Sequence, residues 1–226
     1  QCYLLPLYYH HKILQNQFFE EKEQDLYNST YFSKQSIDFK NIQIDLNQTA
    51  IGIHNQIRAY NFREYQVPKI FDTNIISSKI LNSSSNKKSG SILFENDICF
   101  VISAIDKDIA IFKDRVEDLF LACENGNIEL LNQLIQIPKI INIQNEIGWT
   151  PLIVAIYNNQ KDIFKTLLLN GADLNICNFK GTTPLMYAKS SYLKHNDSEI
   201  LNILLNMDLD IYQKDFLNKN IFDYCL

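Results

Sequence analysis

One short segment, residues 53–68, holds the side chains of this chain that are best suited to bind an anionic ligand. A helix would place Asn55 and Arg58, three residues apart, on one face, and Arg63 follows in a loop that ends at Pro68. Guanidinium groups pair with phosphate oxygens, while amides and an aromatic ring suit a sugar or a base. The segment therefore predicts a substrate-binding site for a diphosphate that carries a sugar or nucleoside. Its candidate residues are Asn55, Gln56, Arg58, Tyr65 and Gln66.

The same residues also fit an ordinary protein surface. Arg58 and Glu64 would then form an exposed ion pair, with Tyr60 and Phe62 in the core. Residue types alone leave both interpretations open.

A helix that begins at Thr49 would position this motif. Ala50, Ile53 and Ile57 form one apolar stripe at helical spacing, and Asn61 suits a left-handed C-cap. Five strand-like runs follow the motif, with Asn96-Asp97 as a hairpin turn and residues 82–90 as a loop. We expect a small antiparallel β meander whose edges pair with a second copy or with the C-terminal part. The runs are residues 69–71, 75–81, 91–95, 98–103 and 108–113.

The motif resembles the region that follows the catalytic domain in formyltransferases, where the string is similar to His-Asn-x-Ile-Arg-Ala. Residues 61–66 resemble the sugar N-formyltransferases that act on dTDP-linked 4-amino-sugars, and residues 30–38 and 102–109 match them too. The chain departs from these sugar enzymes at Tyr60, Ala104 and Lys107. A methionyl-tRNA formyltransferase is disfavoured because its proline-glycine element is missing and the net charge is −5.

The resemblance implies transfer of a formyl group from N10-formyltetrahydrofolate to the 4-amino group of a dTDP-linked dideoxy-sugar, in surface polysaccharide (O-antigen, lipopolysaccharide) biosynthesis. It also implies a homodimer formed through the C-terminal region. The catalytic Asn, His and Asp of the family would lie upstream of Gln1, so no catalytic residue is predicted here and this chain alone is expected to be inactive. His54 is expected to be a hydrogen-bonding partner rather than a base.

A second feature repeats at 33 residues: the string at residues 148–155 returns at residues 181–188 as Gly-x-Thr-Pro-Leu-x-x-Ala. Period and string resemble the ankyrin repeat. Thr150 and Thr183 can cap helices that start at proline, and Gly171 suits a left-handed C-cap. A degenerate first repeat begins near Val116, and residues 218–225 form a half repeat, so we expect about three repeats and a cap. An apolar stripe is predicted on each second helix, and a short insertion at residues 192–197. The stripe residues are Leu167, Leu168, Leu204 and Leu205.

Trp149, the only tryptophan, lies in the finger before a repeat and is predicted to be exposed toward the concave face. It either covers the neighbouring repeat or forms an accessory ligand site that stacks on a flat ring, such as the thymine of a nucleotide sugar.

Composition excludes several classes. The net charge of −5 and the single Lys87-Lys88 run argue against a nucleic-acid surface, and no apolar run is long enough for a membrane span. Five scattered cysteines without a metal-ligand spacing predict reduced, mostly buried thiols, a cytoplasmic location and no metal. The start at Gln1, without Met or a charged leader, indicates a piece of a longer protein.

The sequence predicts an α+β fold, a small antiparallel β meander with a motif helix followed by an all-α ankyrin-repeat stack. The predicted domains are residues 1–48, the tail of a truncated formyltransferase domain; 49–114, the helix and meander; and 115–226, the ankyrin repeats. The function is the C-terminal part of a sugar N-formyltransferase with the repeats as an accessory module. The alternative is an ankyrin adaptor for protein interactions without enzymatic activity.

Overall fold

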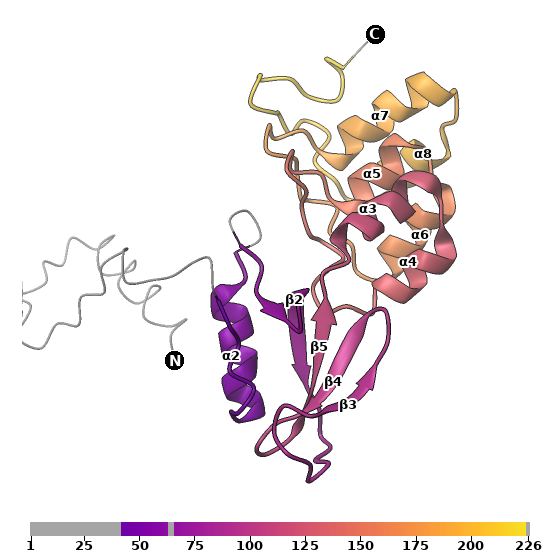
Figure 1. Ribbon diagram of the computed structural model, residues 1–226. Helices are drawn as coiled ribbons and strands as arrows, with labels where there is room; N and C mark the ends of the chain where they lie inside the picture. The colour runs from indigo at the N-terminus through magenta and orange to yellow at the C-terminus, as the bar shows by residue number, and fades with distance from the viewer. Residues whose placement is uncertain (1–41, 63–65, 225–226) are drawn as a thin grey trace, which may run out of the picture. The chain divides into compact units, whose positions relative to one another are not determined.

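The structure is a computed structural model that describes residues 42–62 and 66–224 (Figure 1). Most of the predicted tail at residues 1–48 therefore lies outside the described residues. The described part is α+β, with one helix and all five strands before residue 114 and the other helices after it. The helices are α2 (Ala50–Tyr60), α3 (Val116–Asn125), α4 (Ile128–Leu134), α5 (Pro151–Tyr157), α6 (Lys161–Leu169), α7 (Pro184–His195) and α8 (Glu199–Leu205). The strands are β1 (Lys69–Ile70), β2 (Thr73–Ile80), β3 (Ile92–Glu95), β4 (Cys99–Ser103) and β5 (Asp108–Lys113).

Helix α2 forms where the apolar stripe predicts it. The Thr49 hydroxyl accepts the N–H of Gly52 as an N-cap, and the Asp106 carboxylate accepts the N–H of Ala50 at 2.7 Å. The prediction for the other end is wrong, because Asn61 has an extended backbone instead of a left-handed one. Its side-chain amide donates to the carbonyl of Ile76 on β2, so the chain leaves the helix toward the sheet.

The five strands form one antiparallel sheet in the order β1-β2-β5-β4-β3. Strand positions and the Asn96 turn are confirmed, since the Asn96 side chain accepts the N–H groups of Ile98 and Cys99. A meander through the whole sheet is wrong: β3, β4 and β5 follow one another, but β2 pairs with β5. Strand β5 is the most buried strand and takes the centre, and the loop 82–90 carries the chain to the far edge.

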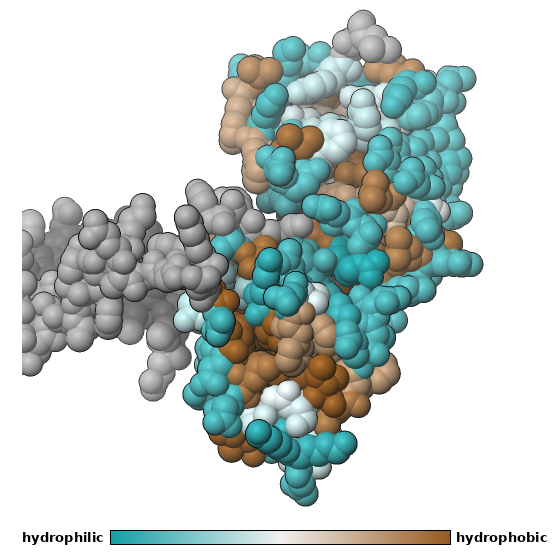
Figure 2. All heavy atoms as spheres, viewed as in Figure 1, coloured by the Kyte–Doolittle hydropathy of each residue, from teal (hydrophilic) through white to brown (hydrophobic). Residues whose placement is uncertain are grey.

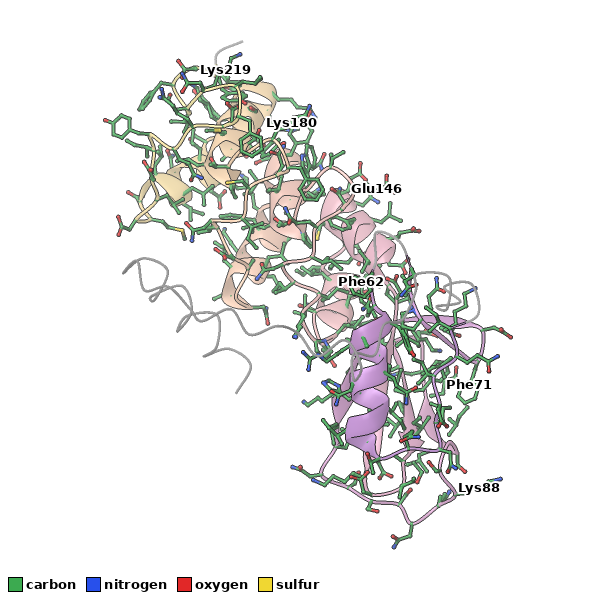
Figure 3. The ribbon with its side chains drawn as sticks, turned by 90° about the vertical axis from the view of Figure 1, so that its left-hand side faces the viewer. Phe62, Phe71, Lys88, Glu146, Lys180 and Lys219 are labelled. Carbon is green, nitrogen blue, oxygen red and sulfur yellow. The ribbon has the colours of Figure 1, made fainter. Side chains whose placement is uncertain are left out.

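Helix α2 covers one face of this sheet (Figure 3). Ile53 and Ile57 are fully buried there, against isoleucines of β2, β4 and β5. Burial of that stripe turns the opposite side of α2 to solvent, which is the side that carries the motif. The sheet partners are Ile75, Ile102, Ile109 and Ile111.

Residues 116–205 form three helix pairs, α3–α4, α5–α6 and α7–α8, in which the first helices contact one another in a row and the second helices in another. Thr150 and Thr183 cap α5 and α7 with proline at the start, as predicted. Gly171 has φ +86°, as a left-handed cap requires. Two details differ: Leu205 is 49% exposed, and residues 192–195 of the insertion belong to α7, whereas the insertion is expected between the two helices of that repeat.

The described residues include no helix that is both long enough and apolar enough to cross a membrane. Three cysteines are described and all are free thiols, but only Cys123 is buried; Cys99 and Cys177 are partly exposed, so the prediction of mostly buried thiols is wrong for these two.

Candidate functional site

Three of the predicted site residues, Asn55, Gln56 and Arg58, lie on α2, and Gln66 lies beyond its end. Asn55 and Arg58 are exposed on its solvent side. The side-chain oxygen of Gln56 accepts the backbone N–H of Asp45 at 2.9 Å, and the side-chain amide of Gln66 donates to the backbone carbonyl of Tyr60 at 3.1 Å. The side-chain amides of Gln56 and Gln66 therefore hydrogen-bond to neighbouring backbone. The Asn55 amide and the Arg58 guanidinium face solvent and are available to a ligand. Tyr65 lies outside the described residues.

Phe62 is 59% exposed and its backbone pairs with Gln66 (Figure 3). The alternative interpretation, which placed this ring in the core, is wrong at that position. Because α2 ends at Tyr60 and Asn61 bonds to β2, Phe62 lies outside the helix and does not continue its apolar stripe.

His54 is a structural residue of α2. Its Nδ1 lies 2.9 Å from the Ser78 hydroxyl on β2. Desolvation, and then the positive charges of Arg58 and Lys139, lower the pKa of His54 from its ordinary value of 6.5. The imidazole is therefore neutral at pH 7, as suits a hydrogen-bonding partner.

A second candidate site surrounds Trp149. Its ring lies 5.1 Å from the ring of Tyr157 and 5.0 Å from that of Tyr187, measured between centroids. Its indole N–H donates to the Tyr187 hydroxyl at 2.7 Å. We call Trp149, Tyr157 and Tyr187 the aromatic cluster. All three are partly exposed, and Trp149 and Tyr187 pack against the core of the repeats, so one side of the cluster is supported by the protein and the other is open to solvent.

The prediction that Trp149 is simply exposed is thus incomplete, because its polar atom is already bonded within the stack. Sequence reasoning missed Tyr157 and Tyr187. Both follow closely the Thr-Pro helix starts that identify the repeats, at the end of α5 and in the first turn of α7. A tyrosine in the helix that follows a finger is the sequence signal that could have identified both residues as neighbours of Trp149.

A polar side chain at one equivalent position shapes each of the three fingers, residues 145–149, 178–182 and 215–219. Asn145, Asn178 and Asp215 stand at equivalent positions, and each side-chain oxygen accepts two backbone N–H groups of its own finger. Asn178 also donates to the Tyr187 hydroxyl at 2.7 Å, which links the second finger to the aromatic cluster. The accepted N–H groups are those of Ile147 and Trp149, Lys180 and Thr182, and Leu217 and Lys219, at 2.8 to 3.1 Å.

Neighbouring fingers are joined through their backbones. The N–H of Phe179 points to the carbonyl of Ile147 at 3.5 Å, and the N–H of Phe216 donates to the carbonyl of Lys180 at 2.9 Å. The tips therefore form a row whose apolar side chains are 53 to 80% exposed. They are Ile147, Phe179, Phe216 and Leu217.

Figure 2 shows hydrophobic residues at the surface over these loops, although single exposed apolar side chains are common on proteins. What distinguishes this set is that the fingers place them side by side, next to the aromatic cluster. We call the finger row together with the cluster the finger face. Such a face can bind a partner through rings and aliphatic groups.

Comparison with known proteins finds ankyrin repeats in the part of the chain that carries the fingers. A family model described as ankyrin repeats, in three copies, matches residues 119–215. A protein of Acanthamoeba polyphaga mimivirus named for its ankyrin repeats is 41% identical over 80 residues, which are 34% of this chain and 14% of that protein. One from Rickettsia bellii is 33% identical over 93 residues, 38% of this chain and 53% of its own length.

A third such protein, from Borreliella burgdorferi, is 28% identical over 147 residues, 60% of this chain and 67% of that protein. The chain thus spans between a seventh and about half of the length of the first two relatives. The matched family model begins at residue 119, so α2 and the sheet lie outside it. Three helix pairs, three fingers of one pattern and these matches agree: the C-terminal part of this chain consists of ankyrin repeats.

Proposed function

We propose that this chain is a binding protein whose ankyrin repeats hold a protein partner on the finger face. The observation that carries the proposal is the aromatic cluster, which leaves three rings partly exposed while hydrogen bonds inside the stack hold the polar atoms of Trp149 and Tyr187. Rigid aromatic side chains are the usual anchors of protein interfaces, because they bury a large area at little cost in conformational entropy. This is the adaptor function of the two classes that the sequence leaves open.

Selection from a random peptide library displayed on phage tests this proposal with the 226-residue chain as bait. We expect enriched peptides whose binding falls at least about tenfold in Trp149→Ala, because anchor residues contribute about 2 kcal/mol or more. Tyr212→Ala is the matched control, since Tyr212 is an exposed ring at the surface that lies outside the cluster. Enrichment that is insensitive to Trp149 would refute the finger face as the binding site.

A second function, the C-terminal part of a sugar N-formyltransferase, is favoured by the region before the repeats. A helix with Asn55 and Arg58 on its solvent side is followed by five antiparallel strands, as the sequence pattern of this region predicts. In this proposal Arg58 contacts the diphosphate of a nucleotide-linked amino sugar, with N10-formyltetrahydrofolate bound mainly by a preceding domain. The chain would be a cytoplasmic homodimer.

Two measurements test this second function. The 226-residue chain, assayed with N10-formyltetrahydrofolate and a dTDP-4-amino-sugar, should show no turnover; turnover would mean that the catalytic groups are in this chain. The coding sequence upstream of Gln1 should contain an Asn-x-His string and then an Asp. A start codon close to Gln1 would leave only the adaptor function.

The aromatic cluster offers a third measurement, because a nucleotide sugar could stack on it. Titration of the chain with a dTDP-sugar, followed by the fluorescence of Trp149, distinguishes a small ligand from a protein partner. No change at millimolar ligand would remove the nucleotide sugar as an occupant of this face.

A further inference from the structure

The second helices of the repeats, α4, α6 and α8, follow one another along the stack, and each contacts the next (Figure 1). Equivalent residues lie 33 apart between the first and second repeats and 37 apart between the second and third, as the spacing of Asn145, Asn178 and Asp215 shows. The burial of equivalent residues can therefore be compared, and it indicates which side of each helix packs against a neighbouring repeat.

One position on these helices faces the preceding repeat. Leu130 occupies it in α4, Ile163 in α6 and Ile200 in α8. Ile163 and Ile200 are buried, at 1% and 2% exposure, whereas Leu130 is partly exposed. The difference follows from place in the stack, because no helix pair precedes α4 among the described residues.

The next position faces the following repeat, and its burial is lost at the other end of the stack. Leu131 in α4 and Phe164 in α6 are fully buried, but Leu201 in α8 is partly exposed. Four residues later Leu205 is 49% exposed, while the equivalent Leu168 of α6 is only partly exposed. Residues four apart share one side of a helix. We call Leu201 and Leu205, on the outer side of α8, the end face.

The turn after the third finger covers only the neighbouring first helix. Residues 221–223 form one turn where a further first helix would begin, and Ile221 is buried there. The Lys189 ammonium of α7 donates to the carbonyl of Ile221 at 2.7 Å, which fixes this turn beside α7. Among the described residues no helix follows α8, so no second helix covers the end face.

The surroundings of the end face are uncharged where the stack elsewhere carries ion pairs. Lys161 and Lys165 on α6 pair with Glu199 on α8, at 2.9 and 2.7 Å. The equivalent residues of α8 are Ser198 and Asn202, which carry no charge. A helix packed against the end face would gain no ion pair of this kind, so apolar contact would supply its affinity.

We propose that the end face binds an amphipathic helix of a partner protein, in the position that a further second helix would take. The chemistry of this helix follows from the two interfaces that the stack already contains. In both, the added helix buries two apolar residues four positions apart. These are Ile163 and Leu167 on α6, and Ile200 and Leu204 on α8, at 0 to 2% exposure. The partner helix should therefore carry Ile or Leu at positions i and i+4.

A second copy of the chain does not offer such a helix. The residues of this pattern on its α6 and α8 are buried within its own stack. The partner is therefore expected to be a different protein. Because the end face lies on α8 and shares no residue with the finger face, the inference goes beyond the adaptor function proposed above.

A synthetic peptide with the sequence of residues 159–170, which include α6, tests the inference with the 226-residue chain. A hydrocarbon staple between positions 165 and 169, both exposed on α6, keeps it helical, because so short a helix is marginal in water. Fluorescence anisotropy of the labelled peptide should show saturable binding at about millimolar concentration or below, with less than about a twofold change as salt rises. The same peptide with Ile163→Asp and Leu167→Asp should not bind. Equal binding of both peptides, or no saturation up to about 10 mM, would overturn the inference.

Two variants of the chain locate the binding. Leu205→Glu should weaken the stapled peptide at least about tenfold, because a carboxylate would be desolvated beneath it. Leu169→Glu is the matched control, since it makes the same change on α6 at a side chain that is 87% exposed. Trp149→Ala should leave the binding unchanged. An equal loss in both glutamate variants, or a tenfold loss in Trp149→Ala, would overturn the inference.

Two other occupants would be recognised by separate measurements. If a second copy covers the end face, sedimentation of the 226-residue chain should show a dimer that Leu205→Glu dissociates. If the same chain covers it, the coding sequence should continue beyond Leu226 with a helix of the same pattern. Either result would overturn the inference of a partner helix.

Discussion

Replacing Tyr187 by Phe tests whether the aromatic cluster is locked by its hydrogen bonds. The substitution removes one hydroxyl and leaves the ring, so the packing against Trp149 and Tyr157 is kept. Two donors lose their acceptor: the indole N–H of Trp149 and the side-chain amide of Asn178, each at 2.7 Å. The hydroxyl also hydrogen-bonds with the Thr182 side chain, so the effect on stability is the effect of these three contacts.

The two donors differ in their access to water. Trp149 is partly exposed and can bond to solvent instead, whereas Asn178 is 9% exposed and its amide would be left without a partner. An unsatisfied buried donor costs about 1–3 kcal/mol and a bond replaced by water about 0.5–1.5 kcal/mol. We expect a loss of about 2–3 kcal/mol in the free energy of unfolding. For a chain of this size that corresponds to a fall of about 4–12 °C in Tm.

Urea denaturation followed by the fluorescence of Trp149 measures this loss, and far-UV circular dichroism shows whether the whole chain unfolds with it. Tyr212→Phe is the matched control, because Tyr212 is 69% exposed and its hydroxyl makes no hydrogen bond to the described residues. If Tyr187→Phe and Tyr212→Phe unfold at the same urea concentration, the hydrogen bonds do not lock the cluster and the reasoning fails.

Three further predictions concern the fingers and the core. Hydrogen bonds from the Tyr224 hydroxyl and from backbone N–H groups hold the pKa of Asp215 below its ordinary 3.8. The ionised carboxylate therefore stabilises the fold above pH 3.8, and this stabilisation is lost as the pH falls through the pKa of the folded state. The stability of Asp215→Asn should depend less on pH below about 4, and an acid unfolding profile equal to that of the unchanged chain would contradict this. Gly148→Ala should cost more than Gly171→Ala in thermal unfolding: both have positive φ, worth about 1–2 kcal/mol of strain, but a Cβ at Gly148 would lie 2.3 Å from the backbone N of Phe179, and one at Gly171 meets nothing within 4 Å. Equal losses would show that the fingers yield. Phe164→Ala should cost about 3–5 kcal/mol in urea unfolding because the ring is fully buried, and a loss below about 1 kcal/mol would place it outside the core.

The local elements were predictable because their signals are local. The stripe of Ala50, Ile53 and Ile57 fixes the position of α2, and the Thr-Pro strings at 150–151 and 183–184 fix the starts of α5 and α7. Helix periodicity, capping hydroxyls and proline each act within a few residues, so neighbouring sequence suffices to detect them. The same holds for most strand positions and for the turn at Asn96.

Contacts between distant residues were not predictable in this way. The order of strands depends on which strand the core buries most fully, and β5 takes the centre only when the sheet is assembled. Asn61 leaves its expected left-handed form because Ile76, fifteen residues later, offers it a carbonyl. The left-handed preference of asparagine is weak compared with a bond that the sheet supplies.

The candidate sites show the same division. Sequence by itself determined that ankyrin repeats form the C-terminal part and that Asn55, Arg58 and Trp149 have chemistry to offer. Only the tertiary structure decided that Gln56 and Gln66 hold backbone, and that Tyr157 and Tyr187 complete a cluster around Trp149. The 33-residue pattern of a repeat is enough to predict where each finger lies. The finger face, however, forms only where successive fingers and helices contact one another, and those contacts depend on packing between repeats.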